Sequence, residues 1–383
     1  MTASWGQFQS LRGIRQVPDD VVLDFGASPR TYRPTTKVLD LRPHAHGHGP
    51  VPIDGPVDWS QLDKLPDLLT VEYAGPARGI VEALATRPGI QFLYWWDAVG
   101  DVDLRATGVR SLQIGGLRLR SVAVHERLES LQLRRAPTTV RVDAADAGHG
   151  LRLQLFHDAS DAVIPVGVRG TRDLWLRVGG EVSASVLSDL TDLEELVLDF
   201  DKPPGNLTDV AELGRHTQLC VLKIHNAYGP VVEDLPELPA LRELELGGTR
   251  MSTAAAANER YRDTSVTVDV WRAKTDEWLA AHMDNPFRDW IEHGEEFALA
   301  ACEAYDRARA ILDAITPIDP DRLALAESAL RGLVADLNAV NEHLGEIDTN
   351  YREQAGEAFR GLARLVEIPA ELERQWFDEG RRF

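Results

Sequence analysis

Three histidines that alternate along one short segment are the clearest candidates for chemistry in this sequence. His44, His46 and His48 stand two residues apart in a stretch rich in glycine and proline. Alternate imidazoles on an extended segment can converge on zinc, nickel or copper. No fourth ligand is evident nearby, and a solvated loop accounts for the same residues. We therefore keep them as weak candidates for a metal site and expect the protein to have no cofactor.

Motifs of the common catalytic classes are absent from the sequence. It has no P-loop, no dinucleotide fingerprint, no nucleophile elbow and no His-Glu-x-x-His zinc motif. Glu292 and Glu296 share one helix face, but two carboxylates at that spacing are usually surface charge. The two cysteines, Cys220 and Cys302, fall in different predicted domains, so a disulfide framework is not expected. We predict that this protein is not an enzyme.

Length, composition and charge limit the partners of the chain. Its 383 residues are 44% hydrophobic, which is enough for a large buried core. The formal net charge of −20 repels phosphate backbones and anionic lipid, so we expect neither nucleic-acid nor membrane binding. The first residues lack the apolar run of a secretory signal, and no stretch reaches the roughly 18 apolar residues of a membrane span. We expect a cytoplasmic protein.

One pattern of apolar residues, L-x-x-L-x-L, recurs through more than half of the chain. Its clearest copies begin at Leu128, Leu193, Leu219 and Leu241. The second apolar anchors of all the copies, strong and weak, lie 19 to 32 residues apart, at Leu39, Val71, Leu93, Leu112, Leu131, Leu151, Leu174, Leu196, Leu222 and Leu244.

These units resemble the leucine-rich-repeat family, whose period is about 20–29 residues. The asparagine that often follows the strand in that family is mostly replaced here, so we expect irregular repeats. Only five of the 41 basic residues are lysine, and this preference for arginine indicates a GC-rich bacterial source. The resemblance implies an α/β fold, a leucine-rich-repeat solenoid with parallel strands. The alternative, unrelated strands in an ordinary α/β sheet, is disfavoured because most intervening segments are too short for crossover helices.

Alternation and stacking explain the pattern without the family name. In L-x-L both leucines lie on one face of a short strand. A single unit cannot cover that face, so units stack and bury a continuous core. We assign residues 1–35 to an N-terminal cap with a strand at 21–25. Residues 36–270 form about ten repeats, with a connector at 252–258 and a last strand at 266–270.

From residue 271 the apolar period becomes helical, which predicts a small all-α bundle over 271–383. Helix starts are predicted at Asn285-Pro286, Asp319-Pro320, Asp348-Thr349 and Pro369. The first of these helices is expected to run to about Ile315. The domain holds 24 Asp and Glu against 13 Lys and Arg, a net charge of −11. This acidity is typical of a solvated surface, and the alternative is a docking surface for a basic partner.

The residues between the buried anchors face outward and form one exposed sheet face. Aromatic and arginine side chains on such a face are typical of interfaces. One alternative is that the aromatic residues 92–96 pack under a cap or the helical domain, and a slip of one residue would exchange the two faces. The candidate partner-binding residues are Tyr94, Trp96, Arg134, Arg152, Trp175, Arg177 and Lys223.

The leading functional hypothesis is a binding module, namely a scaffold, adaptor or inhibitor that holds a protein partner on the exposed strand face. A second hypothesis couples substrate-recruiting repeats to a modifying helical domain, although the missing motifs weigh against it. A third is a bacterial immunity protein that neutralises a basic toxin, which the acidic charge permits. Arrays of this fold serve many functions, so the fold does not name the partner.

Overall fold

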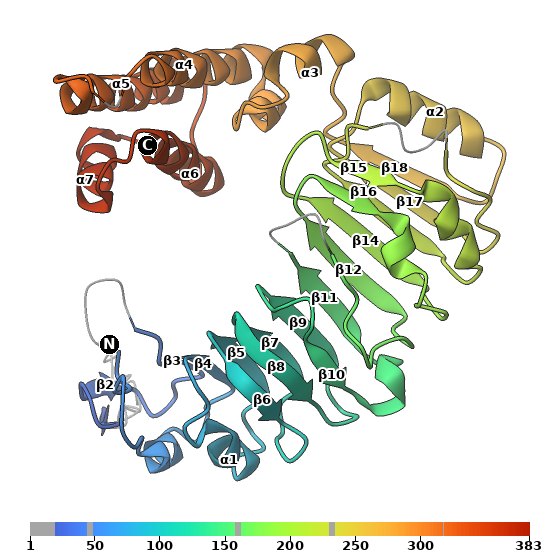
Figure 1. Cartoon of the computed structure of the whole chain (residues 1–383), viewed down its shortest axis with the longest axis vertical. Helices are drawn as coiled ribbons and strands as arrows, with labels where there is room; N and C mark the ends of the chain where they lie inside the picture. Colours follow the sequence, from blue (N-terminus) through green and yellow to red (C-terminus); the bar gives the residue numbers. More distant parts are fainter. Residues whose placement is uncertain (1–19, 44–48, 158–161, 230–233, 317) are drawn as a thin grey trace, which may run out of the picture. The chain divides into compact units, whose positions relative to one another are not determined.

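A computed structural model describes residues 20–43, 49–157, 162–229, 234–316 and 318–383 (Figure 1). The predicted histidine site at His44, His46 and His48 lies outside these residues. No helix among the residues described is long and apolar enough to cross a membrane.

The chain divides into two compact units, which are described separately. The first holds the described residues up to His157, together with residues 162–175 and 189–193. The second holds residues 176–188 and everything from Glu194 to Phe383.

The repeats build a sheet of eleven strands, one from each repeat, in which adjacent strands are parallel (Figure 1). The strands follow one another in the sheet in the same order as in the chain, and the strands that are skipped belong to the segments between the repeat strands. The strands are β3 (Val38–Asp40), β4 (Thr70–Ala74), β5 (Phe92–Trp96), β7 (Ser111–Gly115), β9 (Ser130–Arg134), β11 (Arg152–Phe156), β12 (Asp173–Val178), β14 (Glu195–Phe200), β16 (Val221–His225), β17 (Glu243–Gly247) and β18 (Thr267–Trp271).

Alternation along these strands separates the core from the exposed face. Leu93, Leu131, Leu196, Leu222 and Leu244 are fully buried, as predicted, and each lies between two residues that keep some exposure. Each buried aliphatic side chain contributes about 1.5–3 kcal/mol before chain entropy is counted. Stacked anchors therefore supply the core of the array.

The segments between the main strands are short, as predicted, but they contain more strand than the sequence indicated. The short helices are η1 (Trp59–Lys64), α1 (Ile80–Ala85), η2 (Ala145–Gly148), η3 (Ala184–Leu187) and η4 (Val210–Arg215). Further parallel pairing joins β6 (Val99–Asp103), β8 (Arg118–Ala123) and β10 (Arg141–Asp143), and also β13 (Glu181–Ser183) and β15 (Asn206–Thr208). Ahead of the repeats, β1 (Val21–Leu23) pairs antiparallel with β2 (Arg30–Tyr32), so the strand predicted near residue 21 is confirmed.

The predicted connector at 252–258 is wrong, because this segment belongs to a helix, α2 (Met251–Tyr261). The segment contains a run of alanines, and alanine has the highest helix propensity of all residue types. Ala254 and Ala257 are buried, and the helix packs against β18, the last strand, which was predicted. The array thus ends in a helix and a strand.

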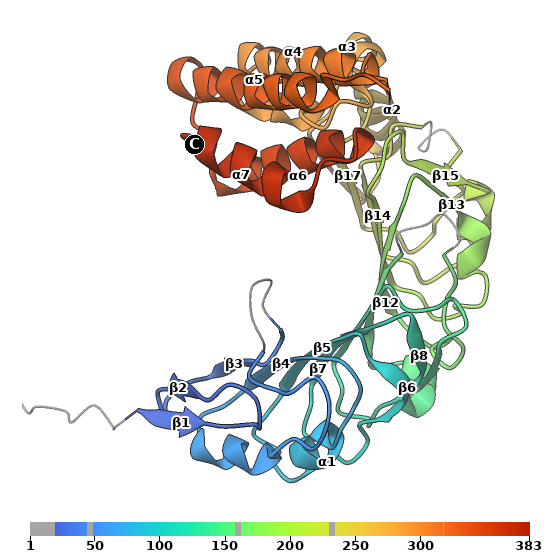
Figure 2. The ribbon, with the colours of Figure 1, turned by 60° about the vertical axis from the view of Figure 1, so that its left-hand side comes forward.

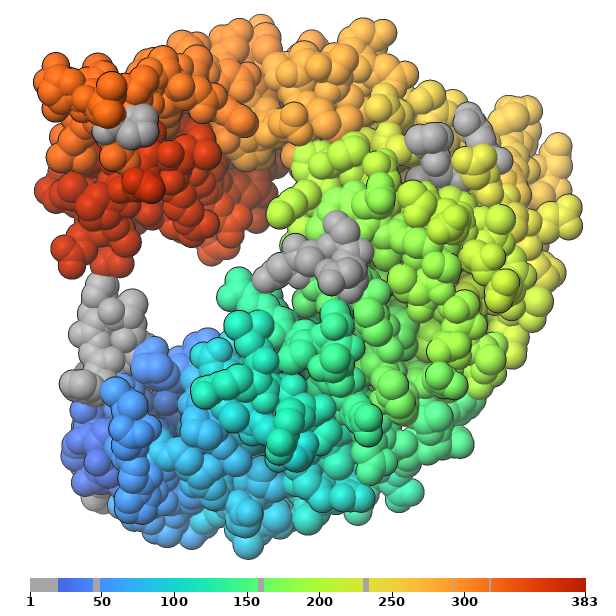
Figure 3. Space-filling model, in the orientation of Figure 1, coloured from blue at the N-terminus to red at the C-terminus, as the bar shows by residue number. Residues whose placement is uncertain are grey.

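After β18 the chain is helical, as predicted, with helices that lie side by side in two views (Figures 1 and 2). The elements are α3 (Asp276–His282), η5 (Arg288–His293), α4 (Glu295–Asp313), α5 (Arg322–His343), α6 (Thr349–Leu365) and α7 (Ala370–Gly380). In the space-filling view, α4 to α7 pack closely (orange to red in Figure 3).

The predicted helix starts have different outcomes. Asp348 caps α6 by accepting a hydrogen bond from the Tyr351 backbone N–H at 2.9 Å, so that start is confirmed. The prediction of one long helix from Asn285 is wrong. Asn285 Oδ1 accepts from the Phe287 backbone N–H at 3.0 Å and precedes only the short η5. Gly294, at φ 125°, then interrupts the helical backbone between η5 and α4.

Cys302 lies in the apolar core of the helical region, and burial raises the pKa of its thiol to about 12. Only the thiolate reacts readily with alkylating reagents. We expect iodoacetamide to leave Cys302 unmodified in the folded protein at mildly alkaline pH and to modify it fully in denaturant, as measured by peptide mass spectrometry. Cys220 is only partly buried and provides an internal reference. Equal labelling of Cys302 with and without denaturant would contradict its burial.

Candidate functional site

The exposed strand face is built from three columns of side chains, because the strands are in register. The central column runs through Glu72, Tyr94 and Gln113 on β4, β5 and β7, and continues through Gln132 on β9. Residues two positions earlier and two positions later on each strand form the flanking columns. Neighbouring strands lie about 4.8 Å apart, so side chains of one column on adjacent strands are in reach of one another.

The prediction that Leu151 is the second anchor of its repeat is wrong. Leu153 pairs with Leu131, so Leu153 is the anchor of β11 and Leu151 is not. The central residue of this strand is Gln154, whose side chain accepts a hydrogen bond from Gln132 at 2.9 Å. Arg152 belongs to the flanking column, where it is exposed and forms an ion pair with Asp173 at 2.6 Å.

The first aromatic cluster of the face is formed by Tyr94, Trp96 and Arg42. The rings of Tyr94 and Trp96 stack with centroids 6.2 Å apart, and the Arg42 guanidinium lies 4.4 Å from the Trp96 ring centroid. Arg42 also pairs with Asp40 at 2.8 Å and Glu72 at 2.6 Å. Both rings remain partly exposed. Two acidic residues therefore hold a cation over an open aromatic surface.

The second aromatic cluster is formed by Phe156, Trp175 and Arg134. The Phe156 and Trp175 rings meet edge to face with centroids 5.7 Å apart. The Arg134 guanidinium lies 5.3 Å from the Phe156 centroid. Like the first cluster, this one combines a partly exposed ring pair with an arginine stacked on one ring. The two clusters occupy the same face of the same unit.

Two further predicted residues lie in the second unit, and each is engaged with carboxylates. Arg177 on β12 pairs with Asp201 and, at 3.7 Å, with Asp199. Lys223 on β16 pairs with Glu243 at 2.9 Å and Glu245 at 3.1 Å. Hydrogen bonding to Glu243 is the main reason why the pKa of Lys223 is raised.

The end of this face is closed by Trp271. Its indole Nε1 donates to Glu245 at 3.0 Å, and its ring meets His225 edge to face with centroids 5.3 Å apart. Burial alone would raise the pKa of Glu245, but hydrogen bonds from Trp271, Lys223 and His225 hold that pKa below its usual range. The indole has room because position 247 is glycine, whose missing Cβ would stand 2.2 Å from the Trp271 ring.

The predicted residues therefore form several groups, and not one continuous site. Tyr94 and Trp96 belong to the first aromatic cluster, and Arg134 and Trp175 to the second. Arg42 and Phe156 were not predicted from the sequence. Phe156 follows from the corrected anchor of β11 by alternation, whereas Arg42 lies just beyond β3, where no strand pattern applies.

Metal chemistry finds little support within the part of the chain that the structure describes. That part contains no group of three or more His, Cys, Asp or Glu side chains arranged to hold a metal ion. The histidine segment at 44–48 falls outside it.

Comparison with known proteins found several similar solved structures, two of which are described here. An internalin from Listeria monocytogenes has 15% sequence identity, with 57% of this chain and 71% of that chain covered and a TM-score of 0.29. A leucine-rich-repeat protein from Leptospira interrogans has 11% identity, with 55% and 91% covered and a TM-score of 0.18. No family model matches the sequence. No curated protein matches it either.

The repeated anchors and the parallel register of the strands define the class of this protein. Each repeat supplies one strand to a parallel sheet, and a short irregular or helical segment leads to the next strand. The protein is an α/β leucine-rich-repeat solenoid followed by a helical region.

Proposed function

We propose that this protein is a binding module that holds a protein partner on the exposed strand face of its first unit. The observation that carries this proposal is the pair of aromatic clusters on that face, each with a partly exposed ring pair and a stacked arginine. From β5 to β11 the sheet advances by three strands, so the clusters are separated by about 14 Å. A single folded partner spans that distance easily.

Interface energetics favour these clusters over the ion pairs of the second unit. Tyr, Trp and Arg dominate binding hot spots. Tyr and Trp in addition bury large areas at a low cost in side-chain entropy. Tyr94 and Trp96 already hold each other in place, so a partner would order little. Lys223, by contrast, has its charge satisfied by two carboxylates, and a partner would have to replace those contacts.

Charge favours a protein over a polyanion as the partner. The net charge of −20 opposes nucleic acid and anionic membranes, as the sequence predicts. The arginines of the two clusters are few and stacked on rings, an arrangement that suits carbonyl oxygens and aromatic side chains of a protein surface. The fold itself does not name the partner.

The test compares wild type with the double variant Tyr94→Ala/Trp175→Ala, which removes one ring from each cluster. Both proteins are immobilised, exposed to lysate of the source organism, and the retained proteins are identified by mass spectrometry. The captured partner is then purified and titrated against each protein. Each hot-spot ring removed is expected to weaken binding by about 10- to 30-fold.

A matched control is available in Tyr261→Ala. Tyr261 lies on α2 in the second unit and also has an arginine over its ring, with Arg260 at 5.5 Å. All three proteins should melt at similar temperatures before they are compared. If a partner binds the double variant as tightly as it binds wild type and the control, these clusters are not the binding site.

A further inference from the structure

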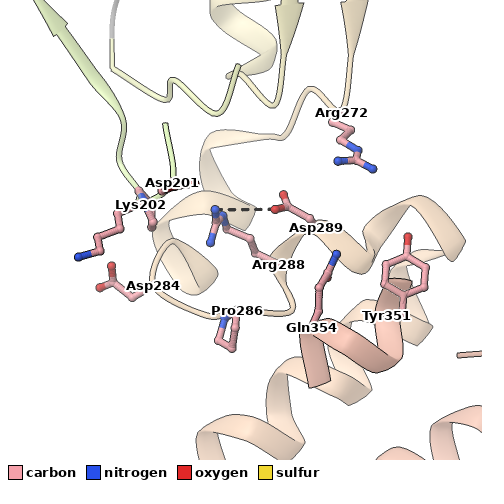
Figure 4. A pocket seen from close by; sticks show the side chains of 10 residues that line it. Asp201, Lys202, Arg272, Asp284, Pro286, Arg288, Asp289, Tyr351 and Gln354 are labelled. Carbon is pink, nitrogen blue, oxygen red and sulfur yellow. Dashed lines mark ion pairs between the residues drawn. The ribbon is translucent and has the colours of Figure 1, made fainter. Parts of the chain in front are cut away.

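A pocket of about 490 Å³ lies within the second unit, whereas the two aromatic clusters belong to the first. Lys202 from the turn after β14 and Arg272 at the end of β18 line it from the repeats. Arg288 from η5 and Gln354 from α6 line it from the helical region (Figure 4). This volume suits a small organic molecule.

Arg288 is a buried cation with poor partners. Only 9% of the residue is exposed. A guanidinium has five N–H donors, and burial makes each unused donor costly. Nη1 of Arg288 donates to the Asn285 carbonyl oxygen at a long 3.4 Å, Nη2 lies 3.7 Å from Asp289, and the guanidinium carbon lies 5.7 Å from the Tyr228 ring centroid. Its Nε is shielded from solvent and has no acceptor among the residues described.

The carboxylate nearest to Arg288 is already engaged elsewhere. Asp289 Oδ1 lies 2.6 Å from the ammonium of Lys274, whose side chain is fully buried. Asp201, a second acid of the pocket, pairs with Arg177. Asp284 is exposed at the rim, where water screens it. The interior around Arg288 therefore keeps an excess of positive charge.

Gln354 adds a donor to the same wall. Its Oε1 accepts a hydrogen bond from the Trp290 indole at 2.8 Å, which fixes the orientation of the amide. The amide nitrogen is then turned away from Trp290 and toward the pocket (Figure 4). The Arg288 guanidinium and the Gln354 amide thus line one space, with the exposed Lys202 at its edge (Figure 4).

We propose that this pocket binds a phosphorylated, hydroxyl-rich small molecule of the sugar-phosphate class, with its phosphate on Arg288. A planar guanidinium matches the oxygens of a phosphate in a two-pronged contact. Lys202 and Gln354 supply further donors. A phosphate dianion needs these donors, whereas a singly charged carboxylate on the ligand would not. The Asp284 carboxylate at the rim accepts a hydrogen bond from a hydroxyl group of the organic body.

The test is calorimetric titration of the full chain with glucose 6-phosphate, glucose, gluconate and inorganic phosphate at constant ionic strength. Glucose 6-phosphate is expected to bind saturably, inorganic phosphate more weakly, and glucose and gluconate not measurably. Absence of saturable binding by both phosphate probes at millimolar concentration overturns the proposal. Gluconate binding as tight as that of glucose 6-phosphate overturns the assignment to phosphate.

Variants separate this site from general charge effects. Gln354→Glu retains an acceptor for Trp290 but turns a negative oxygen toward the phosphate, and it is expected to weaken glucose 6-phosphate binding by about 10- to 100-fold. Arg288→Gln is expected to have an effect at least as large. Lys202→Gln changes an exposed residue. If Arg288→Gln fails to fold, the affinity of Lys202→Gln for glucose 6-phosphate tests the proposal instead.

The charge-matched control is Arg307→Gln on α4, which removes an exposed arginine paired with Asp336 at 2.9 Å. It is expected to bind like wild type. Equal affinity of the Gln354, Lys202 and Arg307 variants would show that the donors of the pocket hold no phosphate.

Discussion

Replacing Lys274 with methionine is expected to lower the free energy of unfolding by about 3–5 kcal/mol. The Lys274 side chain is fully buried, and its ammonium contacts Asp289 at 2.6 Å, the Tyr228 hydroxyl at 3.1 Å and the Arg272 carbonyl oxygen at 3.2 Å. Removal of the ammonium leaves the Asp289 carboxylate in a largely buried position without its closest cation. Chemical denaturation followed by far-UV circular dichroism measures the loss.

The pH dependence of this variant identifies the cause of the loss. Burial would raise the pKa of Asp289, but Lys274 and Arg288 outweigh it and keep that pKa below its usual range. In wild type the stabilisation is therefore complete above about pH 4 and is lost as the pH falls through the lowered folded-state pKa. Without Lys274 the folded-state pKa rises and the carboxyl takes up a proton earlier. The difference in stability between wild type and Lys274→Met should then narrow as the pH falls from neutral toward the pKa of the carboxyl in the variant.

Two further variants control this experiment. Lys274→Met/Asp289→Asn removes both charges and is expected to lose less stability than Lys274→Met alone. Lys202→Met changes an exposed lysine of the same unit and should alter stability by less than about 0.5 kcal/mol. A small loss in Lys274→Met would mean that the pair contributes little, and a large loss that stays constant with pH would mean that the unpaired Asp289 charge is not its cause.

Trp290→Ala is expected to cost about 3–5 kcal/mol. Trp290 is fully buried at the centre of the helical region, where its ring lies 4.4 Å from Phe287, 5.0 Å from Tyr351 and 5.4 Å from Phe297, centroid to centroid. Alanine would leave a cavity among three aromatic rings. It would also leave the Gln354 carbonyl oxygen without its indole donor.

Trp290→Phe is the matched comparison, because it keeps an aromatic ring and removes the indole N–H. Its loss should be smaller, at about 1–2 kcal/mol. Circular dichroism is a better reporter than tryptophan fluorescence here, since the substitution removes a fluorophore. Similar stability of Trp290→Ala and wild type would show that the helical region does not depend on this packing.

The strands were predictable because each carries its own signal. Alternating anchors such as Leu112 and Leu222 need no information from the rest of the chain. The one error of register has the same origin, since Leu151, Leu153 and Leu155 alternate and fit two registers equally well. Three of the additional strands, β10, β13 and β15, have three residues with one of them buried, and that is too little for a pattern.

The candidate site was predictable only by residue type. Tyr94, Trp96 and Trp175 were found because aromatic residues at exposed strand positions stand out. Which arginine covers which ring depends on side-chain contacts that no spacing encodes. The pocket in the second unit was out of reach of the sequence, because Lys202, Arg288 and Gln354 lie far apart in the chain and only folding brings them together.

The indole of Trp271 lies against Gly247, with no space for even a methyl group between them. The two positions are therefore constrained together: while tryptophan occupies 271, glycine is the only residue that fits at 247. A larger residue at 247 can be accommodated only if 271 becomes small or its ring moves away from Glu245. Related sequences that differ here should therefore differ at both positions. A larger residue at 247 should occur together with a smaller residue at 271.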